Sequence, residues 1–286
     1  MRALNCLLIS FASLAFLVRD AVGQDTSRRD APRRAVLVEL YTSQGCDMCP
    51  AAEKILGNLA AGNRMIVPIA FHVDYFNDPW KDVFSDPLYS QRQMTYNNIY
   101  KGPKNPDYGL YYTPMLMIDG VETVNGRDAA SAEAAIRRAL AKKPAVGLQV
   151  AVDVKPGGLS GSAEIKVTSL SARTEKTPLL ACAVLREDGV VTDIPSGENK
   201  GKSLVARFPA RMTKYEFIEL DGKSLKTQRL QFHVGPTWNQ KNLRLAVFIQ
   251  DKRTGAVHQA VDLPWKSTVT DAPSSKTEAE TAATSR

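Results

Sequence analysis

Short apolar runs separated by polar stretches open the first half of the chain. Residues 36–38 (VLV) and 65–73 (MIVPIAFHV) are compact runs with β-branched side chains, which are typical of buried strands. Residues 51–60 (AAEKILGNLA) lie between them, are rich in helix-forming residues and carry their isoleucine and leucines on one face. This order predicts two parallel strands joined by a right-handed helical crossover.

A polar stretch rich in aromatic residues, residues 77–104, follows the second strand. Asp86 or the serine before it is expected to cap a helix that has a proline at its first position. Three larger side chains of this helix either line a substrate surface or pack inward: Tyr89, Arg92 and Tyr96. The stretch is therefore predicted to be a helical insertion.

The segment after the insertion predicts a hairpin and a further helix. Residues 115–126 (MLMIDGVETVNG) predict two antiparallel strands around a tight turn at Asp119-Gly120. Asp128 is expected to cap a helix that continues to about Ala141. Thr113-Pro114, immediately before the hairpin, is a candidate cis peptide bond.

From Val146 onward the pattern changes to alternation of apolar and polar residues, as in VGLQVAVDV and LRLAVFIQD. Turns with glycine or proline separate these segments, and no helical periodicity lies between them. We therefore predict an antiparallel β-sandwich domain at 146–265, after an α/β domain at 35–145. Residues 266–286 are small and polar and predict a disordered tail.

The first 23 residues have the pattern of a secretory signal peptide. One arginine precedes an apolar run, and Ala21-Val22-Gly23 is a small-x-small cleavage site. The alternative is an uncleaved N-terminal anchor. Residues 24–34 predict a polar linker. No later apolar run is long enough to span a bilayer, so we expect an exported protein, periplasmic or extracellular, without a stable membrane span.

Cleavage of the signal leaves few cysteines. Cys6 is lost with it, so the mature chain keeps Cys46, Cys49 and Cys182, too few for a disulfide scaffold. Cys182 lies mid-strand between alanines and is expected to be a buried, inert thiol. The formal charge of +7 comes from dispersed lysines and arginines, which favours solubility over nucleic-acid binding.

Cys46 and Cys49 lie where the first predicted strand gives way to the first predicted helix. A helix N-terminus exposes unpaired N–H groups and the positive end of the helix dipole, which stabilise a thiolate and lower its pKa. Cys46 is therefore expected to be the exposed nucleophile and Cys49 the resolving thiol, joined by a disulfide when oxidised. The rival interpretations are half a zinc site, which needs about four ligands, and an inert structural disulfide.

The second predicted strand ends in HVDYF, where His72 and Asp74 alternate in facing with Val73. The C-terminal ends of parallel strands lie on the ligand side of open α/β sheets. Either side chain is therefore a candidate to approach the cysteines. For His72 the alternative is a buried, hydrogen-bonded histidine that packs the sheet.

Residues 36–141 resemble a thioredoxin fold in the order strand, C-x-x-C, helix, strand, helical insertion, X-Pro, hairpin and helix. The resemblance implies that Pro114 is a cis-proline lying against the cysteine pair and that Thr113 offers backbone groups to a substrate peptide. It also implies that Glu39 is the buried acid that relays a proton to the resolving thiol. Glu39 is one residue farther from Cys46 than that acid is in thioredoxins.

Four segments point to a more specific resemblance than the fold alone: ELYTSQGCDMCPAAE, AFHVDYF, WKDVFSDPLYSQRQ and YTPMLMIDG. Together they resemble the secreted thioredoxin-like family known as domain of unknown function 1223 (DUF1223). The segment DGVVTDIPSGENKGKSL resembles that family's C-terminal domain, although Val205 stands where a histidine is expected. The family has no established activity, so the resemblance implies a fold and export rather than a reaction.

The leading hypothesis is an exported thiol–disulfide oxidoreductase that acts on proteins through Cys46 and Cys49. It needs no dissociable cofactor, because electrons pass to or from a partner dithiol protein. A second hypothesis is a copper-handling protein that uses Cys46, Cys49 and His72, since thiolates select Cu(I) and imidazole tolerates it. A third is a non-catalytic peptide- or protein-binding module with a structural disulfide. The direction of exchange, the client, the role of the sandwich and the oligomeric state stay open.

Overall fold

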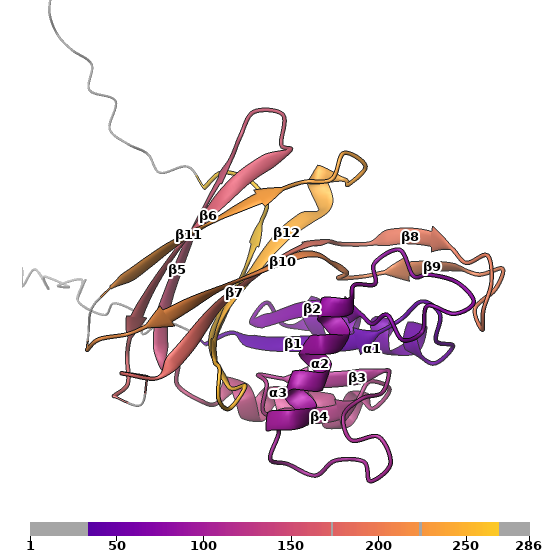
Figure 1. The fold of residues 1–286 in the computed structure, drawn as a ribbon, viewed down its shortest axis with the longest axis horizontal. Coiled ribbons are helices and arrows are strands. Elements are labelled where there is room, and N and C mark those ends of the chain that lie inside the picture. The colour runs from indigo at the N-terminus through magenta and orange to yellow at the C-terminus, as the bar shows by residue number, and fades with distance from the viewer. Residues whose placement is uncertain (1–33, 173, 223–224, 269–286) are drawn as a thin grey trace, which may run out of the picture. The chain divides into compact units, whose positions relative to one another are not determined.

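A computed structural model describes residues 34–172, 174–222 and 225–268, whose elements are drawn in Figure 1. All of these residues belong to one compact unit. The expected signal at 1–23, the expected linker at 24–34 except Arg34, and the tail from residue 269 lie outside the described residues. Among the helices in the described stretches, none is long and apolar enough to cross a membrane.

The first half is built on a four-stranded mixed sheet in the order β2-β1-β3-β4. Its strands are β1 (Val36–Thr42), β2 (Ile66–His72), β3 (Met115–Ile118) and β4 (Glu122–Asn125). β1 and β2 are parallel, and β3 and β4 form an antiparallel hairpin, so these predicted strands are confirmed. The hairpin turns at Asp119 and Gly120, whose φ angles of 48° and 68° lie in the left-handed region that hairpin turns require.

Three α-helices in the described residues cover this sheet: α1 (Cys49–Gly62), α2 (Pro87–Ile99) and α3 (Ala129–Leu140). The carboxylates of Asp86 and Asp128 accept hydrogen bonds from the N–H groups of Leu88 and Ser131, so both predicted caps are confirmed. α1 and α3 pack on one face of the sheet, and α2 packs on the other (Figure 1).

Side chains alternate along β1 and divide the strand between two apolar cores. Val36, Val38 and Leu40 point toward α1 and α3. Leu37 and Tyr41 point the opposite way, toward α2. Because both faces are covered, all seven residues of β1 are buried.

The second half consists of antiparallel strands, as the alternating pattern predicted. One sheet has the order β11-β6-β5, with β5 (Val146–Val154), β6 (Ser160–Ser169) and β11 (Lys226–His233). Another has the order β10-β7-β12-β13, with β7 (Pro178–Glu187), β10 (Ala210–Glu219), β12 (Leu243–Asp251) and β13 (Val257–Pro264). A separate hairpin joins β8 (Val190–Asp193) to β9 (Ser203–Ala206), and a 3₁₀ turn at Gln240–Asn242 precedes β12.

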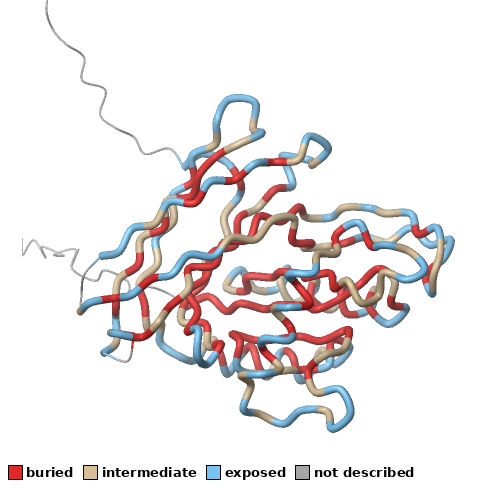
Figure 2. Tube along the Cα trace, viewed as in Figure 1, coloured by how far each residue is buried: buried red, intermediate tan, exposed pale blue. Residues whose placement is uncertain are grey.

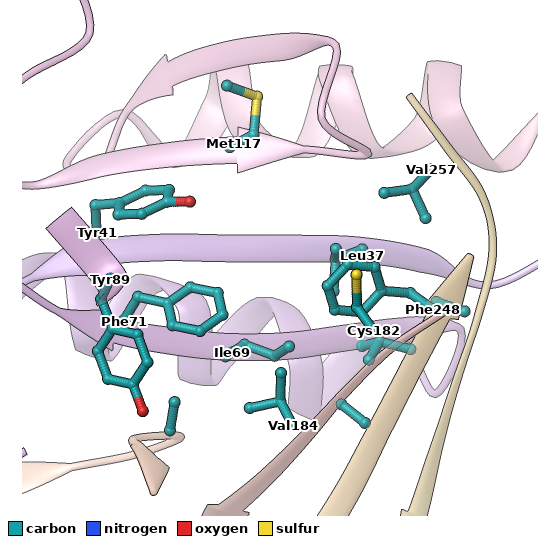
Figure 3. Packing of buried hydrophobic residues seen from close by; sticks show 14 of the residues in the cluster. Leu37, Tyr41, Ile69, Phe71, Tyr89, Met117, Cys182, Val184, Phe248 and Val257 are labelled. Atoms are coloured by element: carbon teal, nitrogen blue, oxygen red, sulfur yellow. The ribbon is translucent and has the colours of Figure 1, made fainter. Parts of the chain in front are cut away.

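The sheet β10-β7-β12-β13 is buried on both faces at its centre (Figure 2). Along β7, Ala181 and Ala183 face the β11-β6-β5 sheet and share a core with it. Cys182 and Val184 face the other way and, with Phe248 of β12, pack against side chains of β1 and β2 (Figure 3). The two halves therefore share an apolar core, which is why Cys182 is buried as expected.

Both ends of the described chain are tied into the fold. Arg34, expected in a solvated linker, is buried, forms an ion pair with Asp119 and donates to the carbonyl of Val257 at 3.1 Å. Ser267 and Thr268, expected in a disordered tail, form hydrogen bonds with β5. The predicted linker and tail are therefore wrong at their inner ends, because the partners of these residues lie far away in sequence.

A buried ion pair lies in the shared core. Glu39 is fully buried, and its two oxygens accept hydrogen bonds from Arg92 Nε and from the Tyr96 hydroxyl, each at 2.6 Å. Gln250 of β12 donates to the same hydroxyl at 2.7 Å and so connects the second half to the pair. Of the two interpretations of this helix, inward packing is therefore the one observed for Tyr89, Arg92 and Tyr96.

Replacing Arg92 with leucine should lower the free energy of unfolding by about 3–5 kcal/mol, because it leaves the Glu39 carboxylate buried without its partner. Urea unfolding of the reduced protein, followed by tryptophan fluorescence, measures this change. The matched control is Arg137→Leu, which breaks an exposed pair with Glu133 and should cost less than about 1 kcal/mol. Equal losses in the two variants would contradict a stabilising role for the buried pair.

Candidate functional site

The two cysteines of the C-x-x-C motif lie in the short connection from β1 to α1. After Thr42 the chain turns, so that the Cys46 N–H donates to the Ser43 carbonyl and the Cys49 N–H donates to the Cys46 carbonyl, each at 3.3 Å. α1 then begins at Cys49 without a side chain that caps its first turn. The N–H groups of Met48 and Cys49 are thus available to the Cys46 sulfur, and they stabilise its thiolate.

The two thiols differ strongly in acidity. A hydrogen bond with Cys49 lowers the pKa of Cys46 to about 7, although burial opposes this shift and the Thr113 hydroxyl assists it. Burial raises the pKa of Cys49 far above its usual range, and the contact with Cys46 raises it further. Both cysteines are free thiols in this structure. At neutral pH, Cys46 is therefore partly a thiolate, and Cys49 remains protonated.

The bond between Thr113 and Pro114 is cis, as the sequence predicted, and leads into β3 beside Cys46. A groove of about 560 Å³ starts there and runs along a loop that carries Tyr108 and Tyr112. Gln93 of α2 holds this loop, because its amide donates to the Tyr112 carbonyl at 2.7 Å. The groove thus joins the cis bond to an aromatic wall.

A segment from the second half covers the cysteine pair. Asn199, in the loop between β8 and β9, is fully buried and donates to the carbonyls of Gln44 (2.8 Å) and Cys46 (2.9 Å). The Asp47 N–H donates to Glu198 of the same loop at 2.9 Å. Figure 1 shows this hairpin reaching over the start of α1. Cys46 is consequently only 1% exposed, so the expectation of an exposed nucleophile is wrong.

His72 ends β2 beside Thr42, with its ring between two carboxylates. Its Nδ1 lies 2.7 Å from Asp82 Oδ2, and its Nε2 lies 3.6 Å from Glu53 Oε1. Burial alone would lower the pKa of His72, but the two carboxylates outweigh it and raise this pKa to about 9. The charge on His72 in turn lowers the pKa of Asp82, although burial opposes it. At neutral pH, His72 is therefore a buried imidazolium.

Asp74 and Glu39 are both bonded to side chains of α2. Asp74 is bound to α2, since its N–H donates to Ser90 Oγ at 3.0 Å and that hydroxyl donates to its carboxylate. Glu39 belongs to the face of β1 that points toward α2, whereas the cysteines lie on the side of α1. The implied proton relay from Glu39 to Cys49 is therefore wrong, because one extra residue turns the side chain to the opposite face.

The described residues contain no group of three or more His, Cys, Asp and Glu side chains that could hold a metal ion. His72 is turned toward Asp82 and Glu53 rather than toward both cysteines. The structure thus does not assemble the three copper ligands that the second hypothesis requires.

Three residues around the thiols were missed by reasoning from the sequence: Glu53, Asp82 and Asn199. Asp82 lies in the segment WKDVF and Asn199 in the segment GENKG, both of which contributed to the family resemblance. Neither segment has a periodic pattern that brings it to the end of β1. Glu53 carried a weak signal, because it lies four residues after Cys49 and so on the same face of α1.

Comparison with known proteins identifies one matching family and solved structures with a similar fold. The profile of a family described as "Protein of unknown function (DUF1223)" matches residues 37–250. A search among curated proteins found no match. The crystal structure of protein AGR_C_4864 from Agrobacterium tumefaciens is similar, with a TM-score of 0.60 and 19% identity, covering 84% of this chain and 98% of that one. HBP35 of Porphyromonas gingivalis has a TM-score of 0.62 and 12% identity, with coverages of 88% and 81%.

The Cys46 thiolate should form with a midpoint near pH 7, and absorbance at 240 nm during a pH titration of the reduced protein measures it. Cys49→Ala removes the hydrogen bond that contributes most to the lowered pKa, so the midpoint should rise by about one unit. Cys46→Ser is the control and should lose the transition. An unchanged midpoint in Cys49→Ala would show that Cys49 does not stabilise the thiolate.

Proposed function

The chain belongs to the DUF1223 family of proteins of unknown function, and we propose that it is an exported thiol–disulfide oxidoreductase acting on proteins through Cys46 and Cys49. The observation that carries this proposal is the placement of two thiols in contact at the start of α1, beside the cis Thr113–Pro114 bond. Cys46 has a pKa of about 7, whereas burial holds Cys49 in the protonated form. Contact between the thiols and the deeper burial of Cys49 produce this difference, which suits an attacking and a resolving thiol.

We propose that residues 35–145 form a thioredoxin-like fold. The sheet order β2-β1-β3-β4, with one parallel pair and one antiparallel hairpin, supports this. So do the cysteine pair at the start of α1 and the cis peptide bond before β3. The antiparallel sheets at 146–265 are then an added part that both buries the α2 side of this fold and supplies the cover of the thiols.

The reaction follows from the acidity of the thiols. The Cys46 thiolate attacks one sulfur of a substrate disulfide, the S–S bond breaks, and the released substrate thiolate takes up a proton. The product is a mixed disulfide at Cys46. Cys49 then loses its proton and attacks the Cys46 sulfur, which forms the Cys46–Cys49 disulfide and releases the second substrate thiol. The substrate is thereby reduced by two electrons, and a partner dithiol protein reverses the sequence.

The groove beside Thr113 and Pro114 is suited to an extended peptide. The Thr113 hydroxyl lies next to Cys46, so a peptide bound along Thr113 would present its sulfur to the thiolate. Tyr108 is 50% exposed and Met48 is 43% exposed, which gives the groove apolar contact surface. Arg127 at its edge adds a positive charge.

The cover over Cys46 favours a second candidate function, a peptide-binding module whose cysteines are structural. Asn199 holds the segment in place with two hydrogen bonds to the backbone around Cys46. A net contribution of about 1 kcal/mol for each such bond allows the loop to open transiently. We prefer the oxidoreductase because Cys46 lies at the uncapped start of α1, beside the cis Thr113–Pro114 bond from which the groove runs.

Reduced mature protein should exchange thiols with a fluorescent peptide disulfide, and Cys46→Ser should fall to the uncatalysed rate because the attacking thiolate is gone. Release of the fluorescent thiol measures the rate. Cys49→Ala should instead accumulate a mixed disulfide visible by mass spectrometry. Cys182→Ala is the matched control, because that thiol is buried and burial raises its pKa to about 12. Exchange that survives in Cys46→Ser would rule out the proposed mechanism.

A further inference from the structure

A cavity of about 190 Å³ lies next to Cys49, between α1, the ends of β1 and β2, and the strand β9. Buried polar atoms line it without a hydrogen-bond partner among the described residues: Thr42 Oγ1, Gln44 Oε1 and Nε2, Glu53 Oε1 and His72 Nε2. Buried polar groups normally have partners, and a cavity of this size with these polar atoms in its wall has room for several water molecules.

Glu53 is held so that one of its oxygens faces this cavity. It lies one turn after Cys49 on α1, and its Oε2 accepts a hydrogen bond from the Arg207 N–H at 3.1 Å. Its Oε1 faces His72 Nε2 at 3.6 Å, which is longer than a normal hydrogen bond and is a separation at which water commonly bridges polar groups. The carboxylate is therefore fixed on one side and open on the other.

The His72 ring forms the wall of the cavity opposite Glu53, and Asp82 holds it in place. Asp82 accepts a hydrogen bond from its Nδ1 and also from the Gln44 N–H, both at 2.7 Å. Because Asp82 holds the ring, the Nε2 atom stays directed at Glu53. The Thr42 hydroxyl lies beside the Cys49 sulfur and lines the same cavity as Glu53.

We propose that Glu53 takes the proton of Cys49 through water held in this cavity, and that His72 and Asp82 position its carboxylate. The inference rests on the proposed function, whose second step needs a base for a deeply buried thiol. The position that the thioredoxin resemblance assigned to the acid cannot serve, since Glu39 faces α2 and Leu40 occupies the face toward α1.

In the resolving step, one S–H bond and one S–S bond break and one S–S bond forms. The S–H bond of Cys49 breaks, and its proton passes through water to Glu53 Oε1, which becomes a carboxylic acid. The Cys49 sulfur then forms a bond to the Cys46 sulfur, while the bond from Cys46 to the substrate sulfur breaks and the electron pair leaves with the substrate thiolate. Glu53 returns its proton to solvent through the side of the cavity formed by exposed Lys54 and Ser203. The reverse direction uses the same groups.

The test follows both steps of one turnover. Reduced protein is mixed with excess glutathione disulfide, quenched in acid and alkylated, and the mixed disulfide at Cys46 and the internal disulfide are quantified by mass spectrometry. Glu53→Gln should form the mixed disulfide at the wild-type rate but convert it to the internal disulfide at least about tenfold more slowly below the Cys46 pKa of about 7. The defect should shrink as pH rises, because hydroxide then replaces the missing base.

Glutamine keeps an oxygen that accepts the bond from Arg207, and the exposed Glu133→Gln is the matched control, expected to resolve at the wild-type rate. The relay is overturned if Glu53→Gln converts the mixed disulfide to the internal disulfide at the wild-type rate over the whole pH range. If that variant does not fold, His72→Gln is measured in its place. A wild-type rate and pH profile for conversion of the mixed disulfide to the internal disulfide in His72→Gln would then overturn the relay. If the wild type forms neither the mixed disulfide nor the internal disulfide, the proposed function itself is overturned, and the relay with it.

Discussion

The alternation of side chains along β1 is the constraint on which the rest of the structure depends. One face of the strand, through Val38, Leu40 and Thr42, meets α1 and ends beside Cys49. The other face, through Leu37 and Glu39, meets α2 and the sheets of the second half. Since a strand side chain has only these two directions, each residue of β1 belongs either to the α1 side, which ends at the thiols, or to the shared core.

This division explains two separate groups of buried charges. On the shared-core face, Glu39 is neutralised by Arg92 and bonded to Tyr96, so the group stabilises the contact between the halves. On the thiol face, His72 lies between Glu53 and Asp82 and retains atoms without partners that face a cavity. Several such atoms gathered around one cavity, beside a charged His72, form the arrangement that the proposed proton transfer needs.

Local features were predictable from the sequence because they depend on neighbouring residues. The strand before Cys46, the helix after it, the Asp86 cap, the turn at Asp119 and the cis bond at Pro114 all follow from short-range patterns. Long-range packing was not predictable. An alternating sequence pattern is the same for a strand with one solvent-exposed face and for a strand such as β7, whose second face is covered by another part of the chain. The sequence therefore did not reveal the shared core. The contact of Asn199 with the cysteine segment comes from a loop, which has no periodic pattern at all.

The account's central claim is that Cys46 and Cys49 form an exchangeable pair rather than a structural disulfide. The most direct test is the reduction potential of this pair, obtained by equilibrating the purified protein in glutathione redox buffers with Cys182→Ala as background. Stabilisation of the Cys46 thiolate favours the dithiol, so the account predicts a potential near or above about −230 mV, in the range of exchangeable dithiols. A potential below about −300 mV, typical of structural disulfides that resist reduction, would contradict it.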